Sequence, residues 1–270
     1  MQGPSRAAAA ASRDAFTAAL AGGADRVRLA QELFEVVGVL DNSATLRRAV
    51  ADPSREGSVK EGLVGRLFDG KVSAATLAVL RGVVAQRWSS EGDLSDTIET
   101  YGVEAVVAEA EVADRADRVE EELFRFERIV AADSGLRTAL TDQGTPADKR
   151  VDLVDSLLRG KVADETLMLV HQAVREPRGQ RFDRVLDGYL DIAAGRRQQQ
   201  TATVTSAVPL SEPDRDRLAQ GLTAIYGGKV HVQTVVDPRV VGGVKVEIGD
   251  ELIDGTIIRK LDGARRAMGA

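Results

Sequence analysis

The sequence predicts a mainly α-helical protein, in which two tandem helical bundles precede a small α+β domain. We expect the first bundle, copy one, in residues 1–104, the second, copy two, in 105–195, and the α+β domain in 196–270. Three observations lead to this prediction. Aromatic residues make up only 4% of the 270 residues, which favours packed aliphatic helices over a large β-sandwich. A helical pattern recurs after 90 residues, and the apolar period becomes alternating after the polar stretch 196–200.

The repeat is the strongest feature of the helical part. The stretch LRRAVADPSREGSVKEGLVGRLFDGKVSAATLAVL, from Leu46, aligns without a gap with LRTALTDQGTPADKRVDLVDSLLRGKVADETLMLV, from Leu136. Between residues 33–80 and their counterparts, 14 of 48 positions are identical, which is far above chance for unrelated sequences. A repeat of this period predicts that one helical unit is present twice.

Each copy carries the signals of several short helices. One apolar stripe with helical spacing comprises Leu63, Val64, Leu67 and Phe68. Gly70 then stands where a helix ends, and a further helix is expected after Ser73. The segment 96–132 contains one glycine and no proline. If it forms a single helix, that helix is about 55 Å long and closes copy one while opening copy two.

The C-terminal domain is expected to combine strands and helices. The stretches TATVTSAVPL, KVHVQTVVD and VVGGVKVEIGD show near-alternation of apolar residues, which predicts strands. The intervening EPDRDRLAQGLTAIYG predicts a helix that carries Leu218, Leu222 and Ile225 on one face. A turn is expected at 249–250, and Asp254 is placed to cap a last helix.

Charge and composition exclude several classes of protein. The net charge of −6 lies in 1–200, because 201–270 holds equal numbers of basic and acidic groups. Ten acidic and three basic residues occupy 99–127, which argues against nucleic-acid binding and is typical of a solvated helix face. The absence of cysteine excludes disulfides and thiolate sites. No signal-peptide pattern and no apolar run of about 20 residues is present, so we expect a cytoplasmic protein without direct membrane insertion.

One stretch has the appearance of a phosphate-binding loop. GRLFDGKV, from Gly65, nearly matches G-x-x-x-x-G-K-[ST], but Val72 lacks the hydroxyl that such a loop supplies to magnesium. The motif also requires a preceding strand, whereas this segment has helical periodicity, and copy two has Asp155 in place of the first glycine. We interpret the stretch as the end of a helix.

The sequence offers no catalytic or metal-binding constellation. The two histidines, His171 and His231, have no companions at metal-ligand spacing, so each is interpreted as structural or surface-exposed. No serine elbow or recognisable acid–base pair occurs. We therefore expect no enzyme activity, no cofactor and no metal.

The chain ends in VVDPRVVGGVKVEIGDELIDGTIIRKLDGARRAMGA, which resembles the C-terminal signature of the delta subunit of bacterial F-type ATP synthase, the counterpart of the mitochondrial oligomycin-sensitivity-conferring protein. The matching positions include Asp237, Pro238, Gly242, Gly243, Gly249, Asp254 and Gly255. In that family these positions shape the domain and are not catalytic. The resemblance covers roughly 105–270. A family member normally has one helical domain, so the duplicated form is similar to the enlarged actinobacterial subunits.

The resemblance implies a non-catalytic peripheral-stalk subunit, present once per complex, at the cytoplasmic face of the bacterial plasma membrane. It would link the catalytic alpha/beta head to the membrane-anchored b subunit and resist rotor torque during proton-driven ATP synthesis. The helical part would receive N-terminal helices of the alpha subunits, and the C-terminal domain would hold the end of the b subunit. We expect copy two to bind the head and copy one to act as a spacer or brace.

Two other readings remain open at this point. The repeat by itself is compatible with a stand-alone helical adaptor or chaperone. An enzyme that uses the carboxylates of 237–254 would require an acid with a strongly perturbed pKa near Asp237 or Asp254.

Overall fold

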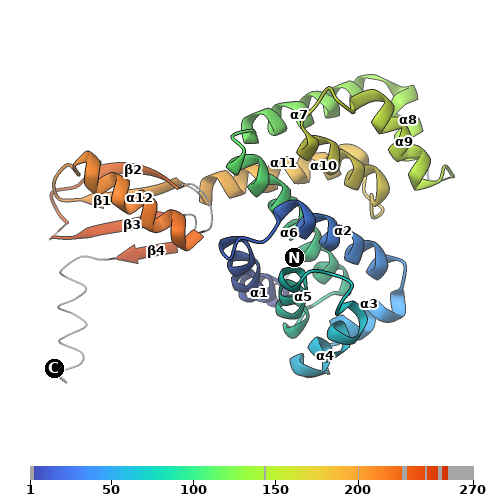
Figure 1. The fold of residues 1–270 in the computed structure, drawn as a ribbon, viewed down its shortest axis with the longest axis horizontal. Coiled ribbons are helices and arrows are strands. Elements are labelled where there is room, and N and C mark those ends of the chain that lie inside the picture. Colours follow the sequence, from blue (N-terminus) through green and yellow to red (C-terminus); the bar gives the residue numbers. More distant parts are fainter. Residues whose placement is uncertain are drawn as a thin grey trace. The chain divides into compact units, whose positions relative to one another are not determined.

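A computed structural model describes residues 3–142, 144–199, 201–226, 230–240, 242–248 and 251–254. The chain divides into two compact units, residues 1–193 and 194–270. The first is helical and the second contains a four-stranded sheet, so the predicted fold class is confirmed (Figure 1). The finer division at 104 and 105 falls within a helix and stays a prediction.

The helices of the first unit repeat in order. Before residue 113 they are α1 (Gly3–Ala21), α2 (Arg26–Asp41), α3 (Ala44–Ala51), α4 (Gly57–Phe68), α5 (Ala74–Ala85) and α6 (Glu91–Val112). After it they are α7 (Ala116–Ala132), α8 (Ser134–Thr141), α9 (Ala147–Leu158), α10 (Asp164–Arg175) and α11 (Phe182–Gln199). Each of α7 to α10 begins 90 residues after its counterpart among α2 to α5. The spacing seen in the sequence is therefore the spacing of equivalent helices.

Helix α6 belongs to both repeats (Figure 1). As the last helix of copy one it places the Tyr101 hydroxyl 2.9 Å from Ser12 Oγ on α1. As the first helix of copy two it offers Glu99, which accepts a 2.7 Å hydrogen bond from the Tyr189 hydroxyl on α11. Because its neighbours lie on several sides, α6 is buried around most of its circumference. The interpretation of 99–127 as a solvated helix face is therefore wrong for 101–110, where even Glu104 is buried.

The segment 96–132 is two helices and not the single helix considered from the sequence. Helix α6 ends at Val112, and α7 begins at Ala116. Between them Asp114 adopts a left-handed conformation with φ 57°, and the Arg115 amide donates to the Ala110 carbonyl at 2.7 Å. Helix α1 ends in the same way with Gly23 at φ 76°. Aspartate tolerates this backbone region better than most residues do, which explains how a segment without a second glycine breaks.

Equivalent carboxylates, one buried and one half-buried, fasten equivalent helices in the two copies. Glu32 on α2 accepts hydrogen bonds from the Ser73 amide at 2.8 Å and the Thr76 hydroxyl at 2.6 Å, at the start of α5. Glu122 on α7 accepts from the Ala163 amide at 2.9 Å and the Thr166 hydroxyl at 2.6 Å, at the start of α10. These contacts satisfy amides that a helix start leaves without partners.

The other local predictions for the copies are confirmed. Gly70 adopts φ 71° after α4, and its counterpart Gly160 adopts φ 75° after α9. Ser73 caps α5, because its Oγ accepts from the Thr76 amide at 3.2 Å. Apolar side chains of both copies form one continuous core, in which Val64 and its counterpart Val154 are equally buried.

The second unit begins with a strand, a crossover helix and a parallel strand. Its elements are β1 (Thr201–Ser206), α12 (Glu212–Tyr226), β2 (His231–Val236), β3 (Val244–Ile248) and β4 (Glu251–Asp254). The strand order is β2-β1-β3-β4; β1 and β2 are parallel, and the other pairs are antiparallel. A parallel pair requires a long connection, and α12 provides it.

The core of this unit is small, with Val204, Leu222 and Val246 among its buried members. Leu218 packs against it as expected, but Ile225 is 61% exposed, so the predicted apolar face of α12 is shorter than the sequence indicated. Strand β4 was not foreseen. The expected turn at 249–250 and the expected last helix lie outside the described residues.

Candidate partner-binding sites

A large open groove lies between α2 of copy one and α10 of copy two. Its volume is about 960 Å³. The apolar part of its lining comprises Phe34 and Val39 on α2 and Leu167 and Met168 on α10. Of these, Val39 is 47% exposed. The groove therefore presents apolar surface that no described part of the chain covers.

Acidic side chains dominate the rim of the groove. Glu35, Asp164 and Glu176 contribute carboxylates, whereas the guanidinium of Arg175 lies 3.7 Å from Asp148. Burial raises the pKa of Glu176, and the negative charge of Asp41 raises it further. The three carboxylates outnumber the single guanidinium, so the rim is acidic.

Gln172 supplies a buried polar atom in the same lining. Its side chain is 5% exposed, and its Nε2 has no hydrogen-bond partner in the described structure. Leaving such a donor unpaired costs about 1–3 kcal/mol. A bound molecule with a suitably placed acceptor would remove this cost.

His171 also borders the groove, and the structure shows what holds it. Its Nε2 lies 2.9 Å from Asp155 Oδ1, and Arg159, which directly follows α9, also pairs with Asp155. The hydrogen bond from Arg159, together with the charge of His171, lowers the pKa of Asp155. Strand β2 carries His231. Among the described residues, no group of three or more histidine, aspartate or glutamate side chains is arranged to hold a metal ion.

A smaller pocket lies in copy two. Its volume is about 320 Å³, and it is lined by Leu140, Ala173 and Phe182 among others. Ala173 is the counterpart of Val83 at the 90-residue spacing. In copy one, the buried Trp88 donates from Nε1 to the Val83 carbonyl at 2.9 Å. In copy one, the Trp88 indole therefore lies beside Val83. In copy two, the equivalent residue Ala173 borders an open pocket.

An ion-pair cluster centred on Arg178 joins the two copies. Arg178 follows α10 with φ 48°, and its side chain is only 12% exposed. It pairs with Asp41 on α2 at 2.7 Å, and with Asp96 at 2.5 Å and Glu99 at 3.2 Å on α6. Sequence reasoning missed this cluster, because Arg178 lies about 80 to 140 residues from its partners and the cluster follows no local pattern.

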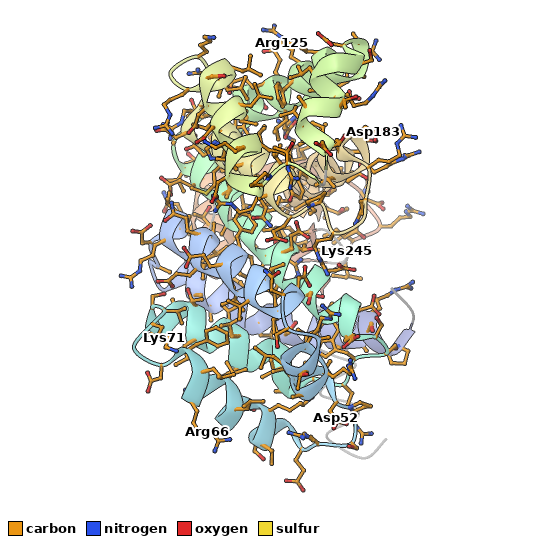
Figure 2. The ribbon with its side chains drawn as sticks, turned by 90° about the vertical axis from the view of Figure 1, so that its right-hand side faces the viewer. Asp52, Arg66, Lys71, Arg125, Asp183 and Lys245 are labelled. Atoms are coloured by element: carbon orange, nitrogen blue, oxygen red, sulfur yellow. The ribbon has the colours of Figure 1, made fainter. Side chains whose placement is uncertain are left out.

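The phosphate-loop-like stretch is the end of a helix, as interpreted. It runs through the last turn of α4, where the Lys71 amide donates to the Phe68 carbonyl at 2.9 Å. The C-terminal end of a helix has negative character, which disfavours phosphate. Figure 2 shows Arg66 and Lys71 projecting into solvent from the outside of copy one.

The family-motif residues that the structure describes build a turn beside the sheet. The Asp237 amide donates to the Ser206 carbonyl at 2.9 Å, and the Val240 amide donates to the Asp237 carbonyl at 3.0 Å, with Pro238 between them. Gly242 and Gly243 have φ of 66° and 78°, a backbone conformation in which a side chain is strained.

The pKa of Asp237 bears on the alternative of an enzyme that uses the carboxylates of the motif. Hydrogen bonds from Arg239 lower the pKa of Asp237, which is the opposite of the shift that a general acid requires at neutral pH. Asp254 is the last residue of β4. Gly249 and Gly255 lie outside the described residues. The function of the motif residues stays a prediction.

The second unit, although the smaller one, carries six exposed large apolar side chains. They are Val208, Ile225, Val235, Val236, Leu252 and Ile253, each at least 44% exposed. Four of them lie on β2 and β4, the two edge strands of the sheet. Edge strands with apolar side chains are surfaces that partners cover.

The chain is similar to proteins with known names. Residues 98–268 match the family model for the ATP synthase delta (OSCP) subunit. A protein of Kineococcus radiotolerans named "ATP synthase subunit delta" is 41% identical over 98% of this chain and 97% of its own length. Proteins with the same name from Thermobifida fusca and Nocardia farcinica are 44% and 43% identical, over 91% and 99% of this chain and 91% and 100% of their own lengths.

The family model and the relatives match different lengths of the chain. The family model begins at residue 98, inside α6, so it covers copy two and the C-terminal unit. The relatives extend over nearly the whole chain, so they include copy one as well. No helix in the described part of the chain is long and apolar enough to cross a membrane. The match covers more than half of the chain and the relatives exceed 40% identity, and the chain therefore belongs to the ATP synthase delta (OSCP) subunit family.

Proposed function

We propose that this chain is a non-catalytic peripheral-stalk subunit of F-type ATP synthase, present once per complex at the cytoplasmic face of the plasma membrane. It links the catalytic alpha/beta head to the membrane-anchored b subunit and resists rotor torque during proton-driven ATP synthesis. The observation that carries this proposal is the separation into two units with independent cores. A linker between two partners needs one folded surface for each.

The helical unit contacts the head in this proposal. Its groove is bordered by α10, whose 12 residues extend about 18 Å. That length suits a guest helix of about three turns, and helix-in-groove binding needs an apolar slot without a titratable centre. The N-terminal helices of the alpha subunits are the proposed guests.

The C-terminal unit holds the end of the b subunit in this proposal. Its support is the set of exposed valine, leucine and isoleucine side chains on β2 and β4. Burying these side chains against the b subunit would stabilise the contact, because each Å² of apolar surface removed from water contributes about 25 cal/mol.

Removal of residues 201–270 tests the proposal. We expect the shortened chain to remain helical by circular dichroism, to bind the isolated alpha/beta head and to lose the b subunit. The full chain should bind both partners at once in a pull-down experiment. A stand-alone adaptor or chaperone, the alternative, would bind neither, and retention of b by the shortened chain would contradict the assignment of the C-terminal unit.

A further inference from the structure

We propose that the α2/α10 groove is a composite site, built jointly by the two copies, and that its guest is an amphipathic helix with basic flanks presented by the catalytic head. This inference rests on the proposed function and makes it more specific. It changes the role expected for copy one, which becomes one wall of the binding site and not only a spacer.

The composition of the walls supports a joint site. Phe34 and Val39 belong to α2, and Leu167 and Met168 belong to α10, so neither copy alone provides both apolar walls. The two walls approach each other at Gly38, where an added Cβ would lie 3.5 Å from Glu176 Oε1. A single helical domain has no equivalent of the α2 wall, because that wall comes from the preceding copy.

The charges on the walls define the guest. Glu35 faces the groove from copy one, and Asp164 and Glu176 face it from copy two. The one arginine of the lining, Arg175, already has Asp148 as a partner. Lysine or arginine side chains on the flanks of a guest helix complement these carboxylates, whereas an acidic helix would be repelled.

Gln172 adds a specific polar requirement. Its buried Nε2 has no partner in the described structure and belongs to the α10 wall. A backbone carbonyl at the C-terminal end of the guest helix, or a side-chain oxygen such as that of serine, would accept this hydrogen bond. The apolar walls, the acidic rim and the unpaired donor therefore all suit an amphipathic helix with basic flanks.

Cysteine protection tests whether both walls are covered. The chain contains no cysteine, so single variants carry one thiol each. Val39→Cys reports on the α2 wall, Arg175→Cys on the α10 wall, and Val59→Cys on the outside of α4 in copy one. Val39 and Val59 are 47% and 51% exposed, so the control position Val59 has nearly the same exposure as the groove position Val39. The measurement is the rate of thiol alkylation in the full chain with and without saturating alpha/beta head.

We expect the head to slow alkylation at Val39→Cys and Arg175→Cys at least about tenfold, and at Val59→Cys less than about twofold. Protection of Arg175→Cys alone would overturn the composite site. A head that binds without protecting either wall would overturn this inference and leave the proposed function standing. A head that does not bind the unmodified chain, measured separately by gel filtration, would overturn both.

Charge reversal tests the nature of the guest. Glu35→Lys should weaken binding of the head about fivefold or more at low salt, and the difference should shrink as salt is added. Glu61→Lys, on α4 of the same copy, makes the same change in net charge outside the groove and should have little effect. Equal losses in the two variants, or tighter binding by Glu35→Lys, would overturn the assignment of a basic guest.

Discussion

Copy one and copy two differ most where the first and fifth helices of each repeat meet. Copy one has Gly82 on α5, and a Cβ at that position would lie 2.7 Å from Ala15 Cβ on α1. Copy two has Gln172 at the corresponding position on α10. Helix α10 packs less closely on α6 than α5 packs on α1. A glycine permits close contact between helices, and a larger side chain separates them, so this one substitution between the copies accompanies the looser packing of α10 on α6.

The two copies share the carboxylate contacts that hold their helices together, but they differ in the side chains at the helix–helix contacts. The carboxylates Glu32 and Glu122 make matching contacts in the two copies. The arginine beside each carboxylate is also repeated, because Arg28 pairs with Glu32 and Arg118 with Glu122, both at 2.7 Å. Surfaces changed while this framework stayed, as expected when the two copies supply different walls of a binding site.

The largest expected effect is that of Arg178→Ala, which breaks the coupling between the copies. Removing one member of a buried ion-pair cluster leaves uncompensated charge, and we expect a loss of about 3 kcal/mol in the free energy of unfolding. Trp88, the sole tryptophan, lies in copy one and reports on that half alone. In urea, the fluorescence and circular dichroism transitions should coincide in the unmodified chain and separate in the variant. Coincident transitions in the variant would show that other contacts couple the copies.

Gly82→Gln makes copy one resemble copy two at the crossing of α1 and α5. The new side chain has no room beside Ala15, so we expect the free energy of unfolding to fall by about 2 kcal/mol. Urea unfolding measures the loss. The reverse change, Gln172→Gly, removes a side chain beside the open groove and should cost less. Equal losses for the two variants would remove the packing difference on which the comparison depends.

Glu32→Gln and Glu122→Gln test whether the repeated fastening is equally strong in both copies. Burial alone would raise the pKa of Glu32, but hydrogen bonds from Thr76 and Ser73 outweigh it and lower the pKa to about 2. The carboxylate therefore stabilises the fold fully above its unfolded value near 4.5, and this contribution is lost as the pH falls towards 2.

We expect Glu32→Gln to cost about 2 kcal/mol at pH 7 and Glu122→Gln about 1 kcal/mol, because Ala163 replaces the second hydroxyl that Ser73 brings to the start of α5. Thermal unfolding from pH 7 to pH 3 measures both the loss and its pH dependence. The Glu32→Gln variant should lose less stability on acidification than the unmodified chain. A parallel loss in the two proteins would contradict the low pKa.

The smallest expected effect is a gain in stability from Gly188→Ala in α11. A Cβ at Gly188 would have no neighbour within 4 Å, so the change should raise the free energy of unfolding by about 0.5–1 kcal/mol through helix propensity. Gly102→Ala in α6 should act in the opposite direction, because its Cβ would lie 2.5 Å from the Phe34 ring. Differential scanning calorimetry of both variants provides the comparison, and the same sign in both would contradict it.

The sequence by itself determined most of the local structure. The spacing of 90 residues, the helix end at Gly70, the cap at Ser73 and the strands after residue 200 follow from patterns within a few residues of one another. The resemblance of the C-terminal stretch also predicted the family that the comparisons show. Short-range patterns suffice here, because helix ends, caps and turns are stabilised by contacts between neighbours in the chain.

Only the tertiary structure decided how the two copies are combined. The acidic composition of 99–127 predicts a solvated helix face, whereas most of 101–110 is buried, and no local pattern indicates that α6 serves both repeats. The partners of Arg178 come from α2 and α6, and the walls of the groove come from α2 and α10. Periodicity indicates which face of a helix is buried and not what buries it, because the partner is selected by the packing of side chains from distant parts of the chain.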